Sequence, residues 1–369
     1  MTGVNTKLSC VPDTSAANQD TSAANLARPF PWPAAAATGV GSMPGTSPAD
    51  ATAVILGELP GFPHLPELPG RGPGADLTGR TAALLIDMPV ETSTSGWRFA
   101  LRAGREQRRA AGLLAEDLDA VQEAAEGYAG PFKVQLAGPW TMAATIELNR
   151  SQNPALADPG AVGDLIVSLA EGVAAHVSEI RKRVPGATIV LQLDEPALPA
   201  VLDGAVPTAS GLNRIGAVDT AVTGGGLRAV LQATTAFSVV HCCAPEYPFG
   251  LIREAGAGAI SFDASQLRRG AEDAIAELAE AGMGILAGAL NTRNAERMTA
   301  APSRKPREIA SSVIELWHRA GLPPATLAEQ VVITPACGLA GFSAAGARAA
   351  LATCREAARI LPELVEERS

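Results

Sequence analysis

Short apolar runs alternate with longer amphipathic stretches along most of the chain. The short runs are typical of parallel strands that are buried on both faces. They predict eight strands, at residues 36–42, 82–90, 133–139, 188–194, 236–242, 258–263, 284–290 and 331–335. The longer stretches have helical periodicity and predict helices at 106–128, 161–183, 218–232, 271–282 and 305–320. Repeated strand–helix units of this kind predict an α/β fold.

Two architectures have this alternation, a closed barrel and an open, doubly wound sheet. The glycine-rich phosphate-binding fingerprint of the open sheet is not found in the sequence, and 369 residues suit a barrel with insertions. We therefore expect a single-domain (β/α)₈ TIM barrel over residues 31–369. Its second strand is the least secure, because residues 59–80 are rich in Pro and Gly and are compatible with a strand or with an excursion over the open end.

Composition and charge narrow the functional classes. Residues 1–30 are rich in Ser, Thr, Asn and Ala and predict a disordered N-terminal tail. The net charge of -9, without clusters of Lys and Arg among aromatics, argues against nucleic acid as a partner. The sequence has no apolar run of about 18 residues and no secretory signal pattern, so we expect a cytoplasmic protein that does not contact the membrane. The five cysteines are unevenly placed, which favours chemistry or packing over disulfides.

Polar side chains gather where the predicted strands end. In a barrel these carboxyl ends converge on one face, where active sites are built. The residues concerned are Ser42, Asp194, Glu195, His241, Cys243, Asp263, Asn291 and Cys337. We therefore expect a catalytic site at this end of the barrel.

A His-x-Cys pair is the strongest local signal. Side chains alternate along a strand, so His241 and Cys243 point to one side and Cys242 to the other, where it packs. With Cys337 and Asp263 they provide one imidazole, two thiolates and one carboxylate, a set that zinc binds tetrahedrally. The alternatives without a metal are that a buried Cys packs as a small apolar residue, and that Asp263 only caps the helix that follows.

The charge of this ligand set indicates the chemistry. Zinc with two thiolates and a carboxylate carries a net charge of about −1, which makes it a weak generator of hydroxide and disfavours hydrolysis. A substrate thiol that replaced the carboxylate would lose its proton and stay nucleophilic. The set therefore favours thiol activation.

Two further segments have the character of a substrate site. Asp194, in the run Gln-Leu-Asp-Glu-Pro, has the charge to bind the ammonium of an amino acid, although two carboxylates before a Pro are also typical of a helix N-terminus. Gly41 and Ser42 end the first predicted strand, and small residues there let backbone amides approach a carboxylate. A tight turn is the alternative for these glycines.

Together, the segments VGSMPG, LQLDEPAL, HCC and ITPACGL resemble the C-terminal catalytic barrel of cobalamin-independent methionine synthase, from about residue 34 to the end. The resemblance implies methyl transfer to the sulfur of homocysteine held on zinc, which yields methionine. The zinc ligands that it implies are His241, Cys243, Asp263 and Cys337. The substrate ligands that it implies are Gly41 and Ser42 for the carboxylate, and Asp194 and Glu67 for the amino group. Asp263 stands where the family usually has Glu.

The departures from the family fall on the side of the methyl donor. The resemblance covers one of the family's two barrels, Ala336 stands where Asp is usual, and the seventh predicted strand lacks an expected His. We therefore leave the donor open between a methyl-folate and a methylated corrinoid protein. Two alternatives to this function are a non-catalytic zinc-binding barrel and a lyase similar to uroporphyrinogen decarboxylase. The decarboxylase needs arginines around its substrate, whereas those here lie mostly in helical stretches.

Overall fold

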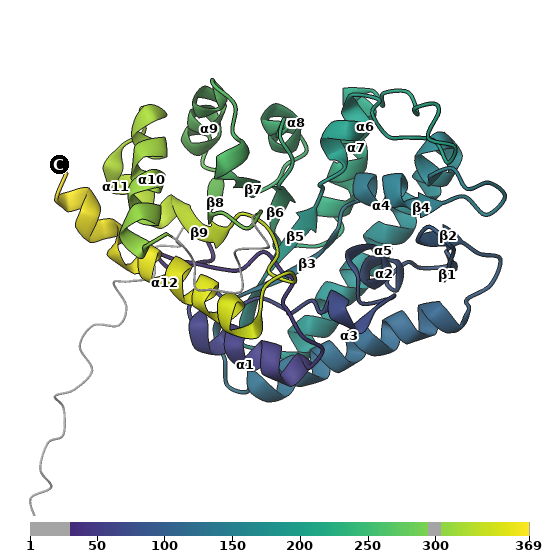
Figure 1. Ribbon diagram of the computed structural model, residues 1–369, viewed down its shortest axis with the longest axis horizontal. Helices are drawn as coiled ribbons and strands as arrows, with labels where there is room; N and C mark the ends of the chain where they lie inside the picture. The colour runs from purple at the N-terminus through teal and green to yellow at the C-terminus, as the bar shows by residue number, and fades with distance from the viewer. Residues whose placement is uncertain (1–29, 294–303, 369) are drawn as a thin grey trace, which may run out of the picture.

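A computed structural model describes residues 30–293 and 304–368. At its centre is a curled, six-stranded parallel sheet with the order β3-β5-β6-β7-β8-β9 (Figure 1). Its strands are β3 (Gly130–Ala137), β5 (Ala187–Asp194), β6 (Phe237–Cys242), β7 (Ala259–Asp263), β8 (Gly284–Leu290) and β9 (Val331–Pro335). These are the last six predicted strands. The predicted tail lies outside the described residues except for Phe30, which is buried and stacks on Trp32.

Helices cover the outside of the sheet (Figure 1). They are α1 (Pro48–Glu58), α2 (Leu77–Ala82), α3 (Arg105–Ala124), α4 (Pro139–Thr145), α5 (Pro159–Arg183), α6 (Leu198–Leu202), α7 (Thr220–Leu231), α8 (Phe249–Glu254), α9 (Ala271–Glu280), α10 (Pro306–Arg319), α11 (Pro324–Gln330) and α12 (Ala344–Glu366). Short 3₁₀ turns lie at Pro69–Arg71, Ala155–Ala157 and Ala264–Gln266. All five predicted helices are present, with ends that differ by a few residues.

Two extended segments link the edge strands of the sheet to each other. Isolated parallel bridges pair Ala37 with Ile333 of β9, Ser42 with Glu67, and His64 with Lys133 of β3. Backbone hydrogen bonds support each bridge, including Thr38 N–H to Ile333 O at 3.2 Å and Leu65 N–H to Lys133 O at 2.8 Å. The Pro-rich stretch 59–80 therefore provides strand-like pairing between the first predicted strand and β3.

The prediction of a strand at 82–90 is wrong. The carboxylate of Asp76 accepts from Gly79 N–H and caps α2, which ends at Ala82. The residues that follow form a turn, with Asp87 at a φ of 54°, before β1 (Val90–Thr92) begins. β1 belongs to a separate small sheet with β2 (Trp97–Phe99) and β4 (Ile146–Glu147). An apolar run of this length has the same pattern in a strand and in a buried turn, so periodicity does not separate them.

The inner face of the sheet changes from apolar to polar along the strands. At the amino-terminal end, side chains from five strands form one cluster with Phe30, Trp32 and Phe62: Val190, Val239, Ala259, Leu286 and Val332. Side chains on one face of a strand recur at every second residue. On that face Val190 is followed by Gln192 and Asp194, and Val239 by His241. The interior therefore becomes polar towards the carboxyl ends of the strands.

One described helix, α5, is long and apolar enough to cross a membrane by length and composition alone. It packs against β5, α4 and α7, and its buried residues include Leu169, Val173 and Val177. We interpret it as a core helix of the α/β fold.

A buried ion network behind the sheet gives a prediction about stability. Asp117 of α3 accepts from both Arg71 and Arg80, and its side chain is fully buried. Asp117→Ala should lower the free energy of unfolding by about 3 kcal/mol, because it leaves two buried cations short of a partner. Asp119→Ala, also on α3, removes the more exposed partner of Arg183 and should cost less than about 1 kcal/mol. Urea denaturation measures both, and equal losses would contradict the prediction.

Candidate active site and metal centre

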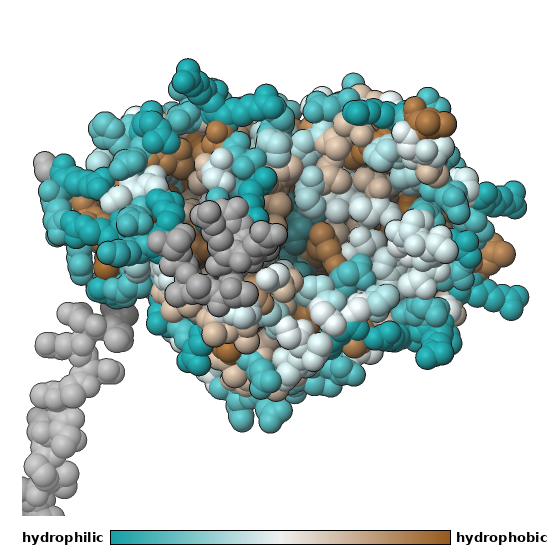
Figure 2. All heavy atoms as spheres, in the orientation of Figure 1, coloured by the Kyte–Doolittle hydropathy of each residue, from teal (hydrophilic) through white to brown (hydrophobic). Residues whose placement is uncertain are grey.

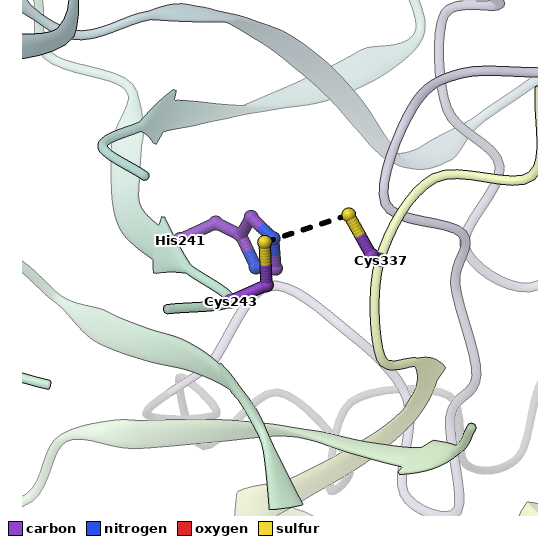
Figure 3. Close-up of side chains that lie close together, drawn as sticks. All are labelled: His241, Cys243 and Cys337. Carbon is purple, nitrogen blue, oxygen red and sulfur yellow. Dashed lines mark hydrogen bonds between the residues drawn. The ribbon is translucent and has the colours of Figure 1, made fainter. Parts of the chain in front are cut away.

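The structure brings three of the four predicted metal ligands together. His241 lies on β6, Cys243 directly follows β6, and Cys337 follows β9. Their ligand atoms all lie within 4.8 Å of one another, and Figure 3 shows the three side chains pointing toward a common centre. The two sulfur atoms are 3.5 Å apart. Tetrahedral zinc with two sulfurs at about 2.3 Å separates them by about 3.8 Å, so the site fits zinc after a small opening.

The imidazole of His241 is oriented for a metal. Its Nδ1 lies 2.9 Å from the hydroxyl oxygen of Ser261 on β7. Its Nε2 is buried and has no hydrogen-bond partner in the described residues. An Nδ1–H that donates to Ser261 leaves the lone pair of Nε2 free, as in metal-ligating histidines generally. An orphaned buried nitrogen is costly unless a ligand satisfies it, which supports a metal at this position.

The sulfur atoms of Cys243 and Cys337 are within hydrogen-bond distance of each other, and either can be the donor. The hydrogen bond from Cys243, helped by His241, lowers the pKa of Cys337, whereas the same contact and burial raise the pKa of Cys243. The pKa values of the two thiols are thus shifted in opposite directions. Both residues are partly exposed, so a small molecule has access to them from solvent.

The prediction for Cys242 is confirmed, whereas the prediction for Asp263 stays open. Cys242 is fully buried in the larger apolar cluster, here called the outer apolar cluster, which also contains Val240 and Phe262. This confirms that Cys242 packs, and burial raises the pKa of its thiol to about 12. Asp263 ends β7 but is not part of the group of three. Its carboxylate accepts from Ser265 N–H at 2.9 Å and from Arg293 Nε at 3.0 Å. In this structure Asp263 thus caps the following turn, and its role as fourth ligand stays a prediction.

Two of the predicted substrate ligands are buried carboxylates, Asp194 and Glu67. Asp194 ends β5, opposite His241 in the register of the sheet, and Glu67 lies on the Pro-rich segment. Burial raises the pKa of Asp194 well above its usual value, and the neighbouring Glu67 and Cys337 add to this, while Lys133 opposes it. Oε1 of Glu67 is buried without a hydrogen-bond partner. Nε of Arg80 lies 4.0 Å from this oxygen, and a further cationic group would relieve the burial of both carboxylates.

Gly41 and Ser42 lie between Glu67, which pairs with Ser42, and Gly338, which follows Cys337. The bridge to Glu67 uses Gly41 O and Met43 N–H, so the N–H groups of Gly41 and Ser42 take no part in it. A Cβ on Gly338 would come within 1.9 Å of the hydroxyl oxygen of Ser42, so Ser42 packs directly against the residue after Cys337. The Gly-Ser turn thus lies next to a predicted metal ligand and a predicted amino-group ligand.

Glu195 has a structural role, unlike its neighbour Asp194. Its fully buried carboxylate accepts from the N–H groups of Trp140 and Thr141 and from the Thr141 hydroxyl, at 2.7 to 2.9 Å. It therefore satisfies the free N–H groups at the start of α4. The alternative for this motif was the N-terminus of the helix that follows it, but α6 has no side-chain cap, and Glu195 serves the start of α4 instead.

The interpretation of the sequence missed several polar residues at the site. Lys133 is fully buried on β3, Gln192 precedes Asp194 by two residues on β5, and Arg293 contacts Asp263. Lys133 and Gln192 had a signal, since they are polar at alternate positions in otherwise apolar strands. Figure 2 shows the surface hollowed near its centre, over the region where Figure 1 has β3, β5 and β6.

Much of the chain matches a known protein family. Residues 155–360, more than half of the chain, match the family described as Cobalamin-independent synthase, Catalytic domain. The chain belongs to this family. The match covers His241, Cys243, Asp263, Cys337 and Asp194. Family membership indicates a methionine synthase-type methyltransferase.

Two solved structures are similar to this chain, and the first of them agrees with it in fold. A methyltransferase from Methanosarcina mazei is 14% identical, with 84% of this chain and 86% of that chain covered and a TM-score of 0.53. A B12-independent methionine synthase from Shewanella sp. W3-18-1, in complex with selenomethionine, is 15% identical, with 68% and 67% covered and a TM-score of 0.48. None of the curated proteins compared with the chain matches it.

Proposed function

We propose that this cobalamin-independent synthase transfers a methyl group to the thiol of homocysteine and so forms methionine, with zinc as its metal. The observation that carries the proposal is the meeting of two groups of residues. His241, Cys243 and Cys337 converge on one point, and Asp194 lies directly opposite His241 in the register of β5 and β6. A thiol site next to a buried carboxylate suits an amino acid that carries a thiol.

Each group of residues has a separate task in this proposal. His241, Cys243 and Cys337 would hold zinc, with Asp263 as a fourth ligand that leaves when the substrate arrives. Zinc held there would keep the homocysteine sulfur deprotonated at neutral pH. Asp194 and Glu67 bind the ammonium of the substrate, and the N–H groups of Gly41 and Ser42 bind its carboxylate.

The same residues orient the substrate for the transfer. The sulfur forms a bond to the methyl carbon as the bond from that carbon to the donor breaks, and the electron pair of that bond stays with the donor. Holding the thiolate in line with the methyl group contributes much of the rate, because it converts an encounter in solution into a step within one complex. The donor is a methyl-folate or a methylated corrinoid protein.

We also infer that the fold is a closed (β/α)₈ barrel. The segments around residues 36–42 and 63–67 occupy the first two strand positions, between β9 and β3. Three isolated bridges and their backbone hydrogen bonds support this. Closure would bring Gly41, Ser42 and Glu67 to the end of the barrel that holds Asp194 and His241, where barrel enzymes have their sites.

Zinc K-edge absorption on the purified protein, with and without L-homocysteine, tests the proposal without knowledge of the donor. We expect two sulfur neighbours around zinc alone and three after homocysteine is added. Zinc with an unchanged count of two would favour the non-catalytic zinc-binding alternative. A protein that binds no zinc would overturn the proposal. Membership in the family already favours methyl transfer over the decarboxylase alternative.

A further inference from the structure

One backbone carbonyl inside the sheet accepts from two buried side chains. The oxygen of Val40 lies 2.7 Å from Nζ of Lys133 and 3.0 Å from Nε2 of Gln192. Lys133 is fully buried and Gln192 is 1% exposed. Val40 directly precedes the Gly41–Ser42 turn, so these two donors fix the position from which the turn starts.

Gln192 links Val40 to Asp194, and Lys133 links Val40 through Gln135 to the segment that carries Glu67. Nε2 of Gln192 also donates to Oδ1 of Asp194 at 2.7 Å, which uses both of its N–H groups. Nζ of Lys133 also donates to Oε1 of Gln135 at 3.2 Å, and Nε2 of Gln135 donates to Leu65 O at 2.6 Å. The segment that carries Glu67 is thereby tied to the same network. Three separate strand positions are thus held at fixed distances by one set of hydrogen bonds.

Lys133 provides a charge to this network but leaves the carboxylates open. It is close enough to Asp194 and Glu67 for both to raise its pKa, against a larger lowering by burial. No ion pair within 4.0 Å joins it to either carboxylate in the described part of the chain, and Oε1 of Glu67 has no hydrogen-bond partner. Lys133 therefore directs its hydrogen bonds to Val40 O and Gln135 Oε1, and Oε1 of Glu67 keeps only a long ion pair, with Nε of Arg80 at 4.0 Å.

We propose that Lys133 and Gln192 are positioning residues, which hold the Gly41–Ser42 turn and Asp194 at the spacing of a carboxylate and an ammonium on one carbon. This inference rests on the proposed function and adds a reason why the site selects a thiol that is also an α-amino acid. The site then binds both the ammonium and the carboxylate of a thiol that is also an α-amino acid. A thiol without the carboxylate loses its contacts with the Gly41–Ser42 turn. Neither residue touches the reacting sulfur.

The experiment compares Gln192→Met with Gln330→Met. Gln330 is a matched control, because its buried Nε2 also donates to two acceptors, Ala279 O at 2.7 Å and Met283 O at 2.8 Å, outside the site. Calorimetry on the zinc-loaded proteins gives the dissociation constants of L-homocysteine and of 3-aminopropane-1-thiol, which lacks the carboxylate. The dissociation constant of 3-aminopropane-1-thiol divided by that of L-homocysteine reports the selectivity for the amino acid.

We expect Gln192→Met to reduce this ratio about tenfold, with zinc content unchanged, because homocysteine needs both halves of the site in register. Gln330→Met should lose similar thermal stability and keep the ratio of the wild type. If Gln192→Met does not fold, Lys133→Met removes the other donor to Val40 and gives the same comparison. An unchanged ratio in the variant that folds would overturn the inference. Failure of the proposed function looks different, since the wild type would then not bind homocysteine at all.

Discussion

Cys243→Ser should lower the affinity for zinc by at least about a hundredfold, whereas Cys242→Ser should keep the zinc of the wild type. The two cysteines are adjacent, but they face opposite sides of the strand. Cys243 lies 3.5 Å from Cys337 and near His241, and Cys242 is buried in the outer apolar cluster. Loss of a direct ligand costs more than the roughly 10–100-fold that follows loss of a supporting contact.

Zinc content after dialysis against a graded chelator measures both variants. Cys242→Ser controls for general damage, because it places a hydroxyl in an apolar cluster and should lower the thermal stability. Equal losses of zinc from both variants would show that alternation along β6 does not decide which thiol binds the metal. Methyl transfer should fall with zinc in Cys243→Ser and persist in Cys242→Ser.

The sequence predicted this part of the site because it depends on local rules. Buried parallel strands are nearly continuous apolar runs, so the last six strands were visible, and the period of two residues assigned His241 and Cys243 to one face. Convergence of Cys337 with them follows from the predicted barrel, because β6 and β9 are three strand positions apart and their ends meet only across a curled sheet. These features follow from the chain itself, without knowledge of distant contacts.

The parts that were not predicted depend on tertiary contacts. The apolar run at 82–90 forms a turn after α2, and the segment around Glu67 pairs with its neighbours only through single bridges, which leave no periodic pattern in the sequence. Whether Asp263 caps a turn or approaches the metal depends on Arg293, whose contact with it spans 30 positions in the sequence. Short-range periodicity holds no information on such contacts.

The polar network inside the sheet could be predicted from the sequence only in part. Lys133, Gln135 and Gln192 occupy the inner face at alternate positions, so the sequence does mark them as unusual. Their common acceptor, Val40 O, belongs to a backbone that is distant in the sequence. The sequence could therefore indicate that these residues are special, but their structural role required the fold.

Asp194→Asn should raise the dissociation constant of L-homocysteine about a thousandfold while zinc stays bound. The change keeps the shape of the side chain but removes the negative charge that faces the substrate ammonium. Removing one partner of a buried, hydrogen-bonded charge pair costs about 2–5 kcal/mol, and a thousandfold corresponds to about 4 kcal/mol. Calorimetry on the zinc-loaded variant measures the loss, and the zinc edge spectrum checks that the metal site is intact.

Glu195→Gln is the matched control, since it removes the neighbouring carboxylate from the same motif. Glu195 caps α4 through Trp140 and Thr141 and faces no substrate group, so its loss should lower the melting temperature and leave homocysteine affinity within about threefold of the wild type. The opposite outcome, with affinity lost in Glu195→Gln and kept in Asp194→Asn, would mean that the two carboxylates have exchanged roles. The ammonium would then have to bind behind β5, at the start of α4, away from Cys243 and Cys337, and transfer to a thiol held by those residues would not be possible.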